Sequence, residues 1–315
     1  MGKKWWTYEK VVFLFKFGEV MSLKTIGILM PGDMGHGCGK IFVDNNFRVV
    51  SCLNNRSDRT KKLSKLAGIE DVKTIENVVN FSDIILSILP PESAFEQAKI
   101  VNQKILESKK HLTYVDCNAV SPSTAERINK TISSQFCNFI DAGIIGLNPI
   151  VENGKTRLYV SGPNTEPIKI LHNKGMIVKD LGSQIGRASA MKMVYASATK
   201  GTFALHAAVS ITAHKLGLSS EYFEELEYSK PDILSAIERM VPRIPLDAAR
   251  WEGEMYEIAN TFSEAGITPK FHQGSADIMS LANKTPIANE TRETVDQSRS
   301  LNQALDMYVD ALKRK

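Results

Sequence analysis

The sequence predicts two domains: a doubly wound α/β domain with a mostly parallel sheet, followed by an all-α domain. From Thr25 to about Gly182, short runs that are apolar on both faces alternate with helix-like stretches, as in a parallel sheet covered on both sides. Beyond Gly186 apolar residues recur at helical spacing, and no strand candidate is convincing. The 315 residues also exceed the size, about 250–300 residues, at which single cores stop growing.

In the first domain we expect strands at residues 25–30, 48–53, 83–89, 112–117, 138–142, 157–161 and 176–180. The second domain opens with one long helix from Ala188 to Leu216, which has no internal proline. Further helices are expected to begin near Pro231, Leu246, Pro269 and Ser300. We divide the chain into an N-terminal extension (1–20), because Met21 opens a natural start, an α/β domain (21–183) and a helical domain (184–315).

Composition excludes several classes of protein. The net charge of +4 is mild, and the basic residues are scattered among acids, so no basic stripe for nucleic acid is present. The four cysteines form no CxxC pair, which argues against the usual zinc sites and against a disulfide framework. No apolar run approaches the roughly 18–20 residues of a membrane span. We therefore expect a cytoplasmic protein with reduced thiols and no metal, which binds neither nucleic acid nor membrane.

A glycine-rich turn, MPGDMG at residues 30–35, follows the first expected strand and leads into a helix. Gly32 and Gly35 stand at the second and third glycine positions of the dinucleotide fingerprint, where the backbone approaches a pyrophosphate at a helix N-terminus. Met30 stands at the first glycine position, so a turn that binds nothing is the alternative. The place of the turn on the first strand favours a Rossmann-type dinucleotide site. Its expected coenzyme ligands are Gly32, Asp33, Met34 and Gly35.

The end of the second expected strand indicates which coenzyme is used. An NAD site usually places an acid there on the ribose 2′-hydroxyl, whereas a 2′-phosphate is repelled by an acid and favours a guanidinium. This chain has Asn55, Arg56 and Ser57 instead of an acid. The corner therefore predicts NADP(H), with Arg56 as the phosphate ligand. The alternative is that Arg56 and Arg59 are solvated loop charges.

Lys192 lies near the start of the long helix, after a segment of small residues that permits close approach of a flat ligand. At helical spacing its neighbours include Ser189, Tyr195 and Thr199, so this face is small and weakly polar. Burial there lowers a lysine pKa toward neutrality, which suits a group that donates a proton and takes it back. Considered alone, a helical lysine is more often a solvated surface charge.

Six motifs, in order along the chain, resemble those of the β-hydroxyacid dehydrogenase superfamily. They are GDMG at 32–35, NRS at 55–57, ILPP at 88–91, VDCNAVSP at 115–122, DAGIIG at 141–146 and the stretch from Gly186 to Lys192. The remainder looks like the 6-phosphogluconate dehydrogenase-like branch with a short, divergent helical C-terminal domain. The resemblance implies a redox enzyme in which Leu89, Pro90 and Asn118 also contact NADP(H).

The resemblance also implies that Lys192 is the general acid/base for the substrate oxygen while hydride passes at the nicotinamide C4. It further implies that Asn118-Ala119-Val120 and Asp141-Ala142-Gly143 line the nicotinamide and substrate pocket. Two positions depart from the family: its usual Asn four residues after the lysine is Ala196, and its Ser-Gly-Gly loop reads Ile144-Ile145-Gly146. Because polar groups are lost, we expect a substrate that is more apolar, or one that is not a β-hydroxyacid.

The residues expected to contact substrate are Ala119, Val120, Gly143, Tyr195, Thr199 and His272. His272 begins a helix and is placed to reach a cleft, from the same or a partner subunit, although a capping or surface role is the alternative. Arg250 and Glu254 have the i, i+4 spacing of a helix-surface pair, which competes with a substrate-anion role for Arg250.

The leading hypothesis is an NADP(H)-dependent dehydrogenase of a small hydroxyacid or alcohol, or the reverse carbonyl reductase, with Lys192 as general acid/base. One alternative is an imine reductase, since proteins that share this resemblance also reduce C=N bonds. Another is a non-catalytic NADP(H)-binding sensor. The long helix, with its large apolar faces, also leads us to expect a homodimer.

Overall fold

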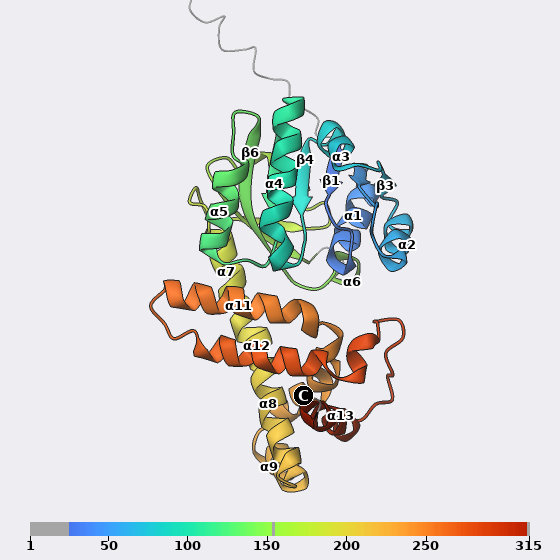
Figure 1. Cartoon of the computed structure of the whole chain (residues 1–315), viewed down its shortest axis with the longest axis vertical. Helices are drawn as coiled ribbons and strands as arrows, with labels where there is room; N and C mark the ends of the chain where they lie inside the picture. Colours follow the sequence, from blue (N-terminus) through green and yellow to red (C-terminus); the bar gives the residue numbers. More distant parts are fainter. Residues whose placement is uncertain (1–24, 153–154, 314–315) are drawn as a thin grey trace, which may run out of the picture.

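The computed structural model describes residues 25–152 and 155–313. The extension expected at residues 1–20 lies outside the described residues. Figure 1 shows the α/β unit, coloured blue to green, beside a helical unit coloured yellow to red. The last described strand ends at Asp180 and the next helix begins at Arg187, on either side of the boundary predicted after residue 183.

The described strands form one eight-stranded sheet in the order β3-β2-β1-β4-β5-β6-β7-β8. Their bounds are β1 (Thr25–Ile28), β2 (Arg48–Ser51), β3 (Glu70–Asp71), β4 (Ile84–Ser87), β5 (Leu112–Asp116), β6 (Cys137–Ile145), β7 (Arg157–Ser161) and β8 (Ile177–Asp180). Of these neighbouring strands only β6 and β7 are antiparallel, which confirms the mostly parallel sheet. Strand order reverses between β1 and β4, and the carboxyl ends of these strands mark the point where ligands bind in such sheets.

Helices cover both faces of the sheet because its strands are apolar on both sides. One face packs against α1 (Asp33–Asp44) and the 3-10 helix η1 (Glu166–Leu171), with α2 (Asp58–Leu66) packed on α1, and the other against α3 (Ile75–Phe81), α4 (Pro91–Ser108) and α5 (Pro122–Ile132). In β4, Ile84 and Leu86 belong to the first core and Ile85 to the second, as strand alternation requires. The short helix α6 (Pro149–Glu152) follows β6.

The helical unit begins with α7 (Arg187–Ala196), the π-helical turn η2 (Ser197–Gly201) and α8 (Thr202–Lys215). These three form the long helix that the sequence predicts, with the π turn as an unforeseen interruption. The remaining elements are α9 (Ser219–Ser229), α10 (Pro231–Met240), η3 (Val241–Leu246), α11 (Ala248–Glu264), α12 (Lys270–Asn283), η4 (Pro286–Asn289) and α13 (Leu301–Lys313). Helix starts expected near Pro231, Leu246, Pro269 and Ser300 are confirmed within two residues. Helix α9 and the two-residue strand β3 were not predicted.

The two units meet where α11 crosses the carboxyl end of the sheet (Figure 1). The Glu257 carboxylate on α11 accepts a hydrogen bond from the backbone N–H of Ser121, at the start of α5, with an N···O distance of 2.6 Å. No described helix is long and apolar enough to cross a membrane. The described cysteines, Cys38, Cys52, Cys117 and Cys137, are buried and free.

Candidate active site

Lys192 is held against strand β6. Its side chain is half-buried, and Nζ donates a hydrogen bond to the backbone carbonyl of Ile144 at 2.5 Å. A Cβ atom on Gly143 would lie 2.8 Å from Cβ of Lys192, closer than real Cβ atoms approach, and 3.0 Å from the carbonyl oxygen of Ala188, tighter than most Cβ contacts. Glycine at position 143 therefore lets α7 approach β6, and the predicted pocket role of Gly143 becomes a packing role beneath the lysine.

Asp141, on the same strand, caps the helix that carries Lys192. Its Oδ2 atom accepts from the backbone N–H groups of Gly186, Ala188 and Ser189 at 2.9, 3.0 and 3.1 Å. The hydroxyls of Ser161 and Ser189 donate to its two oxygens at 2.9 and 2.5 Å. A carboxylate is stabilising at a helix N-terminus because it satisfies free amides and complements the helix dipole.

The Asp141 side chain is completely buried, so the expectation that it lines the pocket is wrong. Burial raises the pKa of this carboxyl, and its hydroxyl and amide donors oppose the rise. Since Asp141, Gly143 and Ile144 all lie in β6, one strand sets both the start of α7 and the position of Lys192.

A group of charges centred on the buried carboxylate of Glu254 lies near Lys192. Glu254, on α11, is paired with both Lys200 and Arg250, and its side chain is only 3% exposed. Arg250 also contacts Asp247 at 3.0 Å. The expected Arg250–Glu254 pair therefore exists, but its carboxylate is buried instead of lying on the helix surface. Lys200, from the π turn η2, is the partner that the sequence pattern does not reveal, because 54 positions separate it from Glu254.

These charges act on the titration of Lys192. Burial lowers the pKa of Lys192 to about 8, and the nearby positive charge of Arg250 adds to this effect. The pKa of Lys200 also falls well below its usual range, through burial and then through the charges of Lys192 and Arg250. A lysine with a pKa of about 8 exchanges a proton near neutral pH, as a general acid/base must.

The other substrate contacts expected on this helix, Tyr195 and Thr199, differ in their surroundings from Lys192. Thr199 lies seven residues after Lys192, within the π turn, and its hydroxyl donates to the carbonyl oxygens of Tyr195 and Ala196 at 3.2 and 3.3 Å. Tyr195 is 41% exposed, and Ala196, at the family's Asn position, is 2% exposed. The surroundings of Lys192 are thus poor in free polar side chains, as the sequence predicts.

His272 does not occupy the position expected of a substrate ligand. It is 5% exposed, its Nε2 atom is hydrogen-bonded to the Ser197 hydroxyl at 3.0 Å, and its ring packs edge-on against Phe262. Ser197 lies about 140° around the helix from Lys192, at 100° per residue. His272 therefore packs on a different helix face from the lysine, and its geometry supports a structural role.

At the other end of the site, the glycine turn has the form that a dinucleotide requires. The N–H of Gly32 donates to the carbonyl of Met30 at 2.9 Å, and a Cβ on Gly35 would lie 2.3 Å from that same oxygen. A Cβ on Gly32 would meet nothing within 4 Å, and no described side chain caps α1. The helix start is therefore open for an anion. Met34 lies in the first turn of α1, where it packs on the core.

Arg56 lies under this turn. One guanidinium nitrogen is 3.4 Å from the carbonyl of Leu29 and another is 3.8 Å from the sulfur of Met30. Its Nε is buried and has no hydrogen-bond partner among the described residues. Asn55 adopts a left-handed turn (φ 59°), and the Ser57 hydroxyl caps α2 by accepting from Thr60 N–H at 3.2 Å. The corner thus places a cation with spare donors beside the glycine turn.

The loop after β5 is buried, in contrast to the pocket position expected for it. Asn118 is 1% exposed: its Oδ1 accepts from the Leu89 N–H at 2.6 Å and its Nδ2 donates to the Ser87 hydroxyl at 2.9 Å. Val120 is fully buried in the α/β core, so neither residue lines an open pocket as expected. Asn118 instead fixes the end of β4, just before Pro90 begins the approach to α4. Ala119 is half-buried and packs against the helical core.

Two family models match the chain. Residues 25–173 match the NAD binding domain of 6-phosphogluconate dehydrogenase, and residues 213–281 match a domain of unknown function, DUF1932. A relative from Methanothermus fervidus, an uncharacterized 28.5 kDa protein in the 7S RNA 5′ region, is 34% identical over 202 residues. This match covers 64% of the present chain and 76% of the relative.

Solved structures share the whole fold. The conserved protein MTH1747, described as structurally similar to 3-hydroxyacid dehydrogenases, is 25% identical with a TM-score of 0.59, over 82% of this chain and 98% of its own. The Mycobacterium tuberculosis 3-hydroxyisobutyrate dehydrogenase with L-serine is 15% identical with a TM-score of 0.62, over 90% and 98%. An imine reductase from Myxococcus stipitatus with NADP+ is 16% identical with a TM-score of 0.55, over 90% and 99%. The chain belongs to the β-hydroxyacid dehydrogenase superfamily, in its 6-phosphogluconate dehydrogenase-like branch.

Proposed function

We propose that the protein is an NADP(H)-dependent oxidoreductase that transfers hydride between the nicotinamide and the CH–OH/C=O carbon of a small hydroxyacid or alcohol. The observation that carries the proposal is Lys192, a lysine with a pKa of about 8 that β6 and a capped helix hold beside the carboxyl end of the sheet. Membership of a dehydrogenase superfamily supports the redox class.

The residues at the switch point fit the coenzyme. The uncapped start of α1 offers amide donors to a pyrophosphate, with Gly32 open toward the ligand side. The spare Nε donor of Arg56 suits a 2′-phosphate, because a guanidinium binds phosphate through several parallel hydrogen bonds. Leu89 and Pro90, at the end of β4, border the same edge of the sheet. When bound, the coenzyme supplies or accepts hydride at the nicotinamide C4.

Lys192 handles the proton that accompanies the hydride. In carbonyl reduction its ammonium donates a proton to the substrate oxygen, and in alcohol oxidation its neutral amine takes the hydroxyl proton. A pKa of about 8 keeps both forms populated near neutral pH. The carbonyl of Ile144 orients the amine, and the positive charge of Arg250 favours release of the proton.

The charges and the apolar residues around Lys192 define the substrate class. The protonated amine of Lys192 and the nearby guanidinium of Arg250 repel one another, so this position favours a substrate with one anionic group. The missing Asn and the apolar Ile144-Ile145 segment favour a substrate with few further polar groups. The substrate contacts proposed on this basis are Ala119, Tyr195 and Thr199.

A second candidate is reduction of a C=N bond. The observation that favours it is Ala196, because a buried methyl at the family's Asn position removes a hydrogen-bond partner for a substrate hydroxyl. Lys192 then donates its proton to nitrogen instead of oxygen. An imine reductase with NADP+ shares the fold, and that likeness extends to the fold alone.

We also propose a homodimer and a cytoplasmic location. Leu205 and Leu216 on the long helix are 61% and 67% exposed, and Val209 lies between them on the same exposed stripe. Exposed apolar side chains along one helix face are often covered by a partner, and a symmetric second copy is the commonest one. Free, buried cysteines suit a reducing compartment.

The proposal is tested with purified full-length protein. NADPH and NADH binding are measured by calorimetry, and coenzyme absorbance is followed with hydroxyacids, alcohols, aldehydes and cyclic imines in both directions. We expect tighter binding of NADPH and turnover of an oxygen substrate. Turnover of imines alone supports the second candidate. Coenzyme binding with no turnover of any substrate in the panel contradicts an enzymatic function and supports the non-catalytic NADP(H)-binding sensor.

A further inference from the structure

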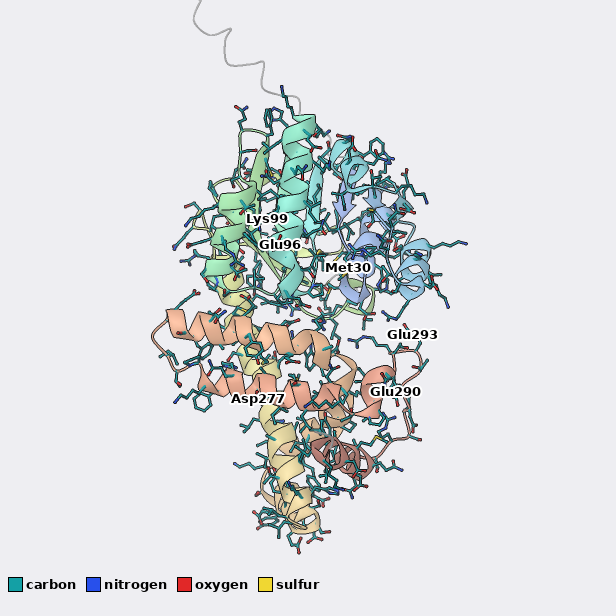
Figure 2. All side chains as sticks on the ribbon, in the orientation of Figure 1. Met30, Glu96, Lys99, Asp277, Glu290 and Glu293 are labelled. Atoms are coloured by element: carbon teal, nitrogen blue, oxygen red, sulfur yellow. The ribbon has the colours of Figure 1, made fainter. Side chains whose placement is uncertain are left out.

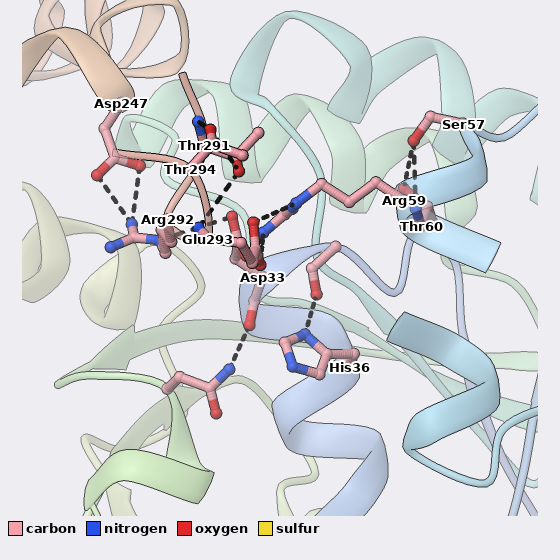
Figure 3. A network of polar contacts seen from close by, with 12 residues as sticks. Asp33, His36, Ser57, Arg59, Thr60, Asp247, Thr291, Arg292, Glu293 and Thr294 are labelled. Carbon is pink, nitrogen blue, oxygen red and sulfur yellow. Dashed lines mark hydrogen bonds and ion pairs between the residues drawn. The ribbon is translucent and has the colours of Figure 1, made fainter. Parts of the chain in front are cut away.

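A loop from the helical unit reaches the coenzyme end of the α/β unit. We call residues 290–299, between η4 and α13, the strap. Figure 2 shows Glu293 on the side of the helical unit that faces α2, with Glu290 lower in the view. Figure 3 shows the contacts that the strap makes: Arg292 and Glu293 meet Asp33 of the glycine turn and Arg59 of α2. The strap therefore joins the two units at the corner predicted to hold the coenzyme.

Arg59 is the centre of this contact. Its Nη2 atom lies 2.7 Å from Asp33 Oδ1 and 3.0 Å from Glu293 Oε1, and its Nε lies 3.3 Å from Glu293 Oε2. The Glu293 carboxylate thus binds the guanidinium through two parallel contacts, the same geometry with which arginine binds phosphate. Hydrogen bonding to Arg59 lowers the pKa of Glu293 to about 2, so this competitor is charged at all physiological pH values.

Arg292 anchors the other side of the strap. Its Nη2 atom lies 2.9 Å from Asp247 Oδ2, and its Nε lies 3.8 Å from Asp33 Oδ2. Arg292 and Arg59 together offset the Asp33 carboxylate, which otherwise repels the phosphates of a ligand at the α1 N-terminus. Arg292 of the strap therefore favours phosphate binding at this site, whereas Glu293 opposes it.

The position of Arg59 connects the contact to the coenzyme. Arg59 lies three residues after Arg56, in the first turn of α2, at the strand end where the ribose of a dinucleotide is read. Its side chain is 35% exposed and that of Glu293 is 57% exposed, so the pair is reachable from solvent. Exposed ion pairs are weak, and a dianionic phosphate is a stronger partner for a guanidinium than one carboxylate.

We propose that Glu293 is a specificity-determining residue: it occupies Arg59 in the free protein, and the 2′-phosphate of NADP(H) displaces it. This inference rests on the proposed NADP(H) function. Because the displaced group belongs to the helical unit, coenzyme binding frees one of the strap's two contacts with the α/β unit while Arg292 stays beside Asp33. NADH, which lacks the 2′-phosphate, leaves the Arg59–Glu293 pair in place.

The test compares wild type with Glu293→Gln, which keeps the size of the side chain and removes its charge. Dissociation constants are measured by calorimetry for NADPH, NADH and 2′,5′-ADP. We expect NADPH and 2′,5′-ADP to bind about 2–5-fold more tightly to the variant, the range that loss of one exposed ion pair allows, with NADH affinity unchanged. The matched control is Asp296→Asn, which removes a strap charge that lies on Ser298 instead of Arg59.

Three results overturn the inference. If Glu293→Gln binds NADPH no more tightly than wild type, Glu293 does not compete with the coenzyme. If NADPH and NADH both bind more tightly by the same factor, the effect is not linked to the 2′-phosphate. If Asp296→Asn tightens NADPH binding as much as Glu293→Gln does, the effect comes from net charge alone. Failure of the coenzyme proposal is recognised separately, because wild-type protein then binds NADPH no more tightly than NADH.

Discussion

Replacing Asp141 with Asn tests whether β6 sets the position of Lys192. The amide keeps the shape of the side chain but loses the charge, and it keeps one acceptor oxygen where the carboxylate serves three N–H groups and two hydroxyls. Hydrogen bonds to a charged acceptor are worth ~1.5–3 kcal/mol each and neutral ones about 1 kcal/mol. Part of the hydrogen-bond set is retained, and removal of a buried charge offsets part of the loss, so we expect a net loss of about 3 kcal/mol in the free energy of unfolding.

Thermal unfolding and steady-state kinetics both measure the effect of Asp141→Asn. The melting temperature should fall by about 6–12 °C, since 1 kcal/mol shifts it by ~2–4 °C in domains of 150–250 residues. The value of kcat should fall about 10–100-fold while coenzyme affinity stays within about twofold, because small misplacement of a reacting group is costly. A melting temperature within about 1 °C of wild type together with unchanged kcat refutes the capping role.

The matched control is Asp116→Asn, one strand away and opposite Asp141 in the sheet register. Asp116 is as buried as Asp141, but it accepts from one backbone N–H, of Asn118, and its Oδ2 has no partner among the described residues. Burial raises the pKa of Asp116 to about 7. A raised folded pKa means that stability is lost as pH rises through about 4 to 7, so this variant should gain stability at pH 8 and little at pH 4.

Four further outcomes are expected. Arg56→Ala should weaken NADPH binding about tenfold with little change for NADH, in a calorimetric titration, and equal losses contradict the coenzyme choice. The reduction rate should be level below pH about 8 and fall above it, while oxidation rises up to that pH, because Lys192 must be charged in one direction and neutral in the other. Arg250→Gln should move this pKa upward in the pH profile. Light scattering should give twice the mass of one chain, and Leu205→Glu should yield monomers; a monomeric wild type contradicts the dimer.

The sequence predicts most of the sheet because its strands are apolar on both faces, a local pattern that the packing preserves. It misses β3, which has two residues, and α9, in which no described residue is buried. These elements lack the apolar periodicity on which the prediction depends.

The candidate site was predicted less completely. Lys192 and the glycine turn carry local signals, small residues around a lysine and glycines after a strand. The cap by Asp141, the partnership of Lys200 with Glu254 and the contact of Glu293 with Arg59 join residues that are 45 to 234 positions apart. Such contacts follow from tertiary packing, so no spacing rule in one sequence reveals them. The burial of His272 likewise follows from tertiary packing, so its position in the helical unit could not be read from the sequence.

Lys192→Met tests the central claim most directly. The substitution removes the titrating amine while keeping an unbranched side chain that fits between α7 and β6. The account predicts that turnover with the best substrate of the panel falls at least about a thousandfold, within the 10²–10⁴-fold worth of general acid–base catalysis, and that NADPH affinity stays within about twofold. Retained turnover with normal coenzyme binding contradicts the assignment of Lys192 as the general acid/base.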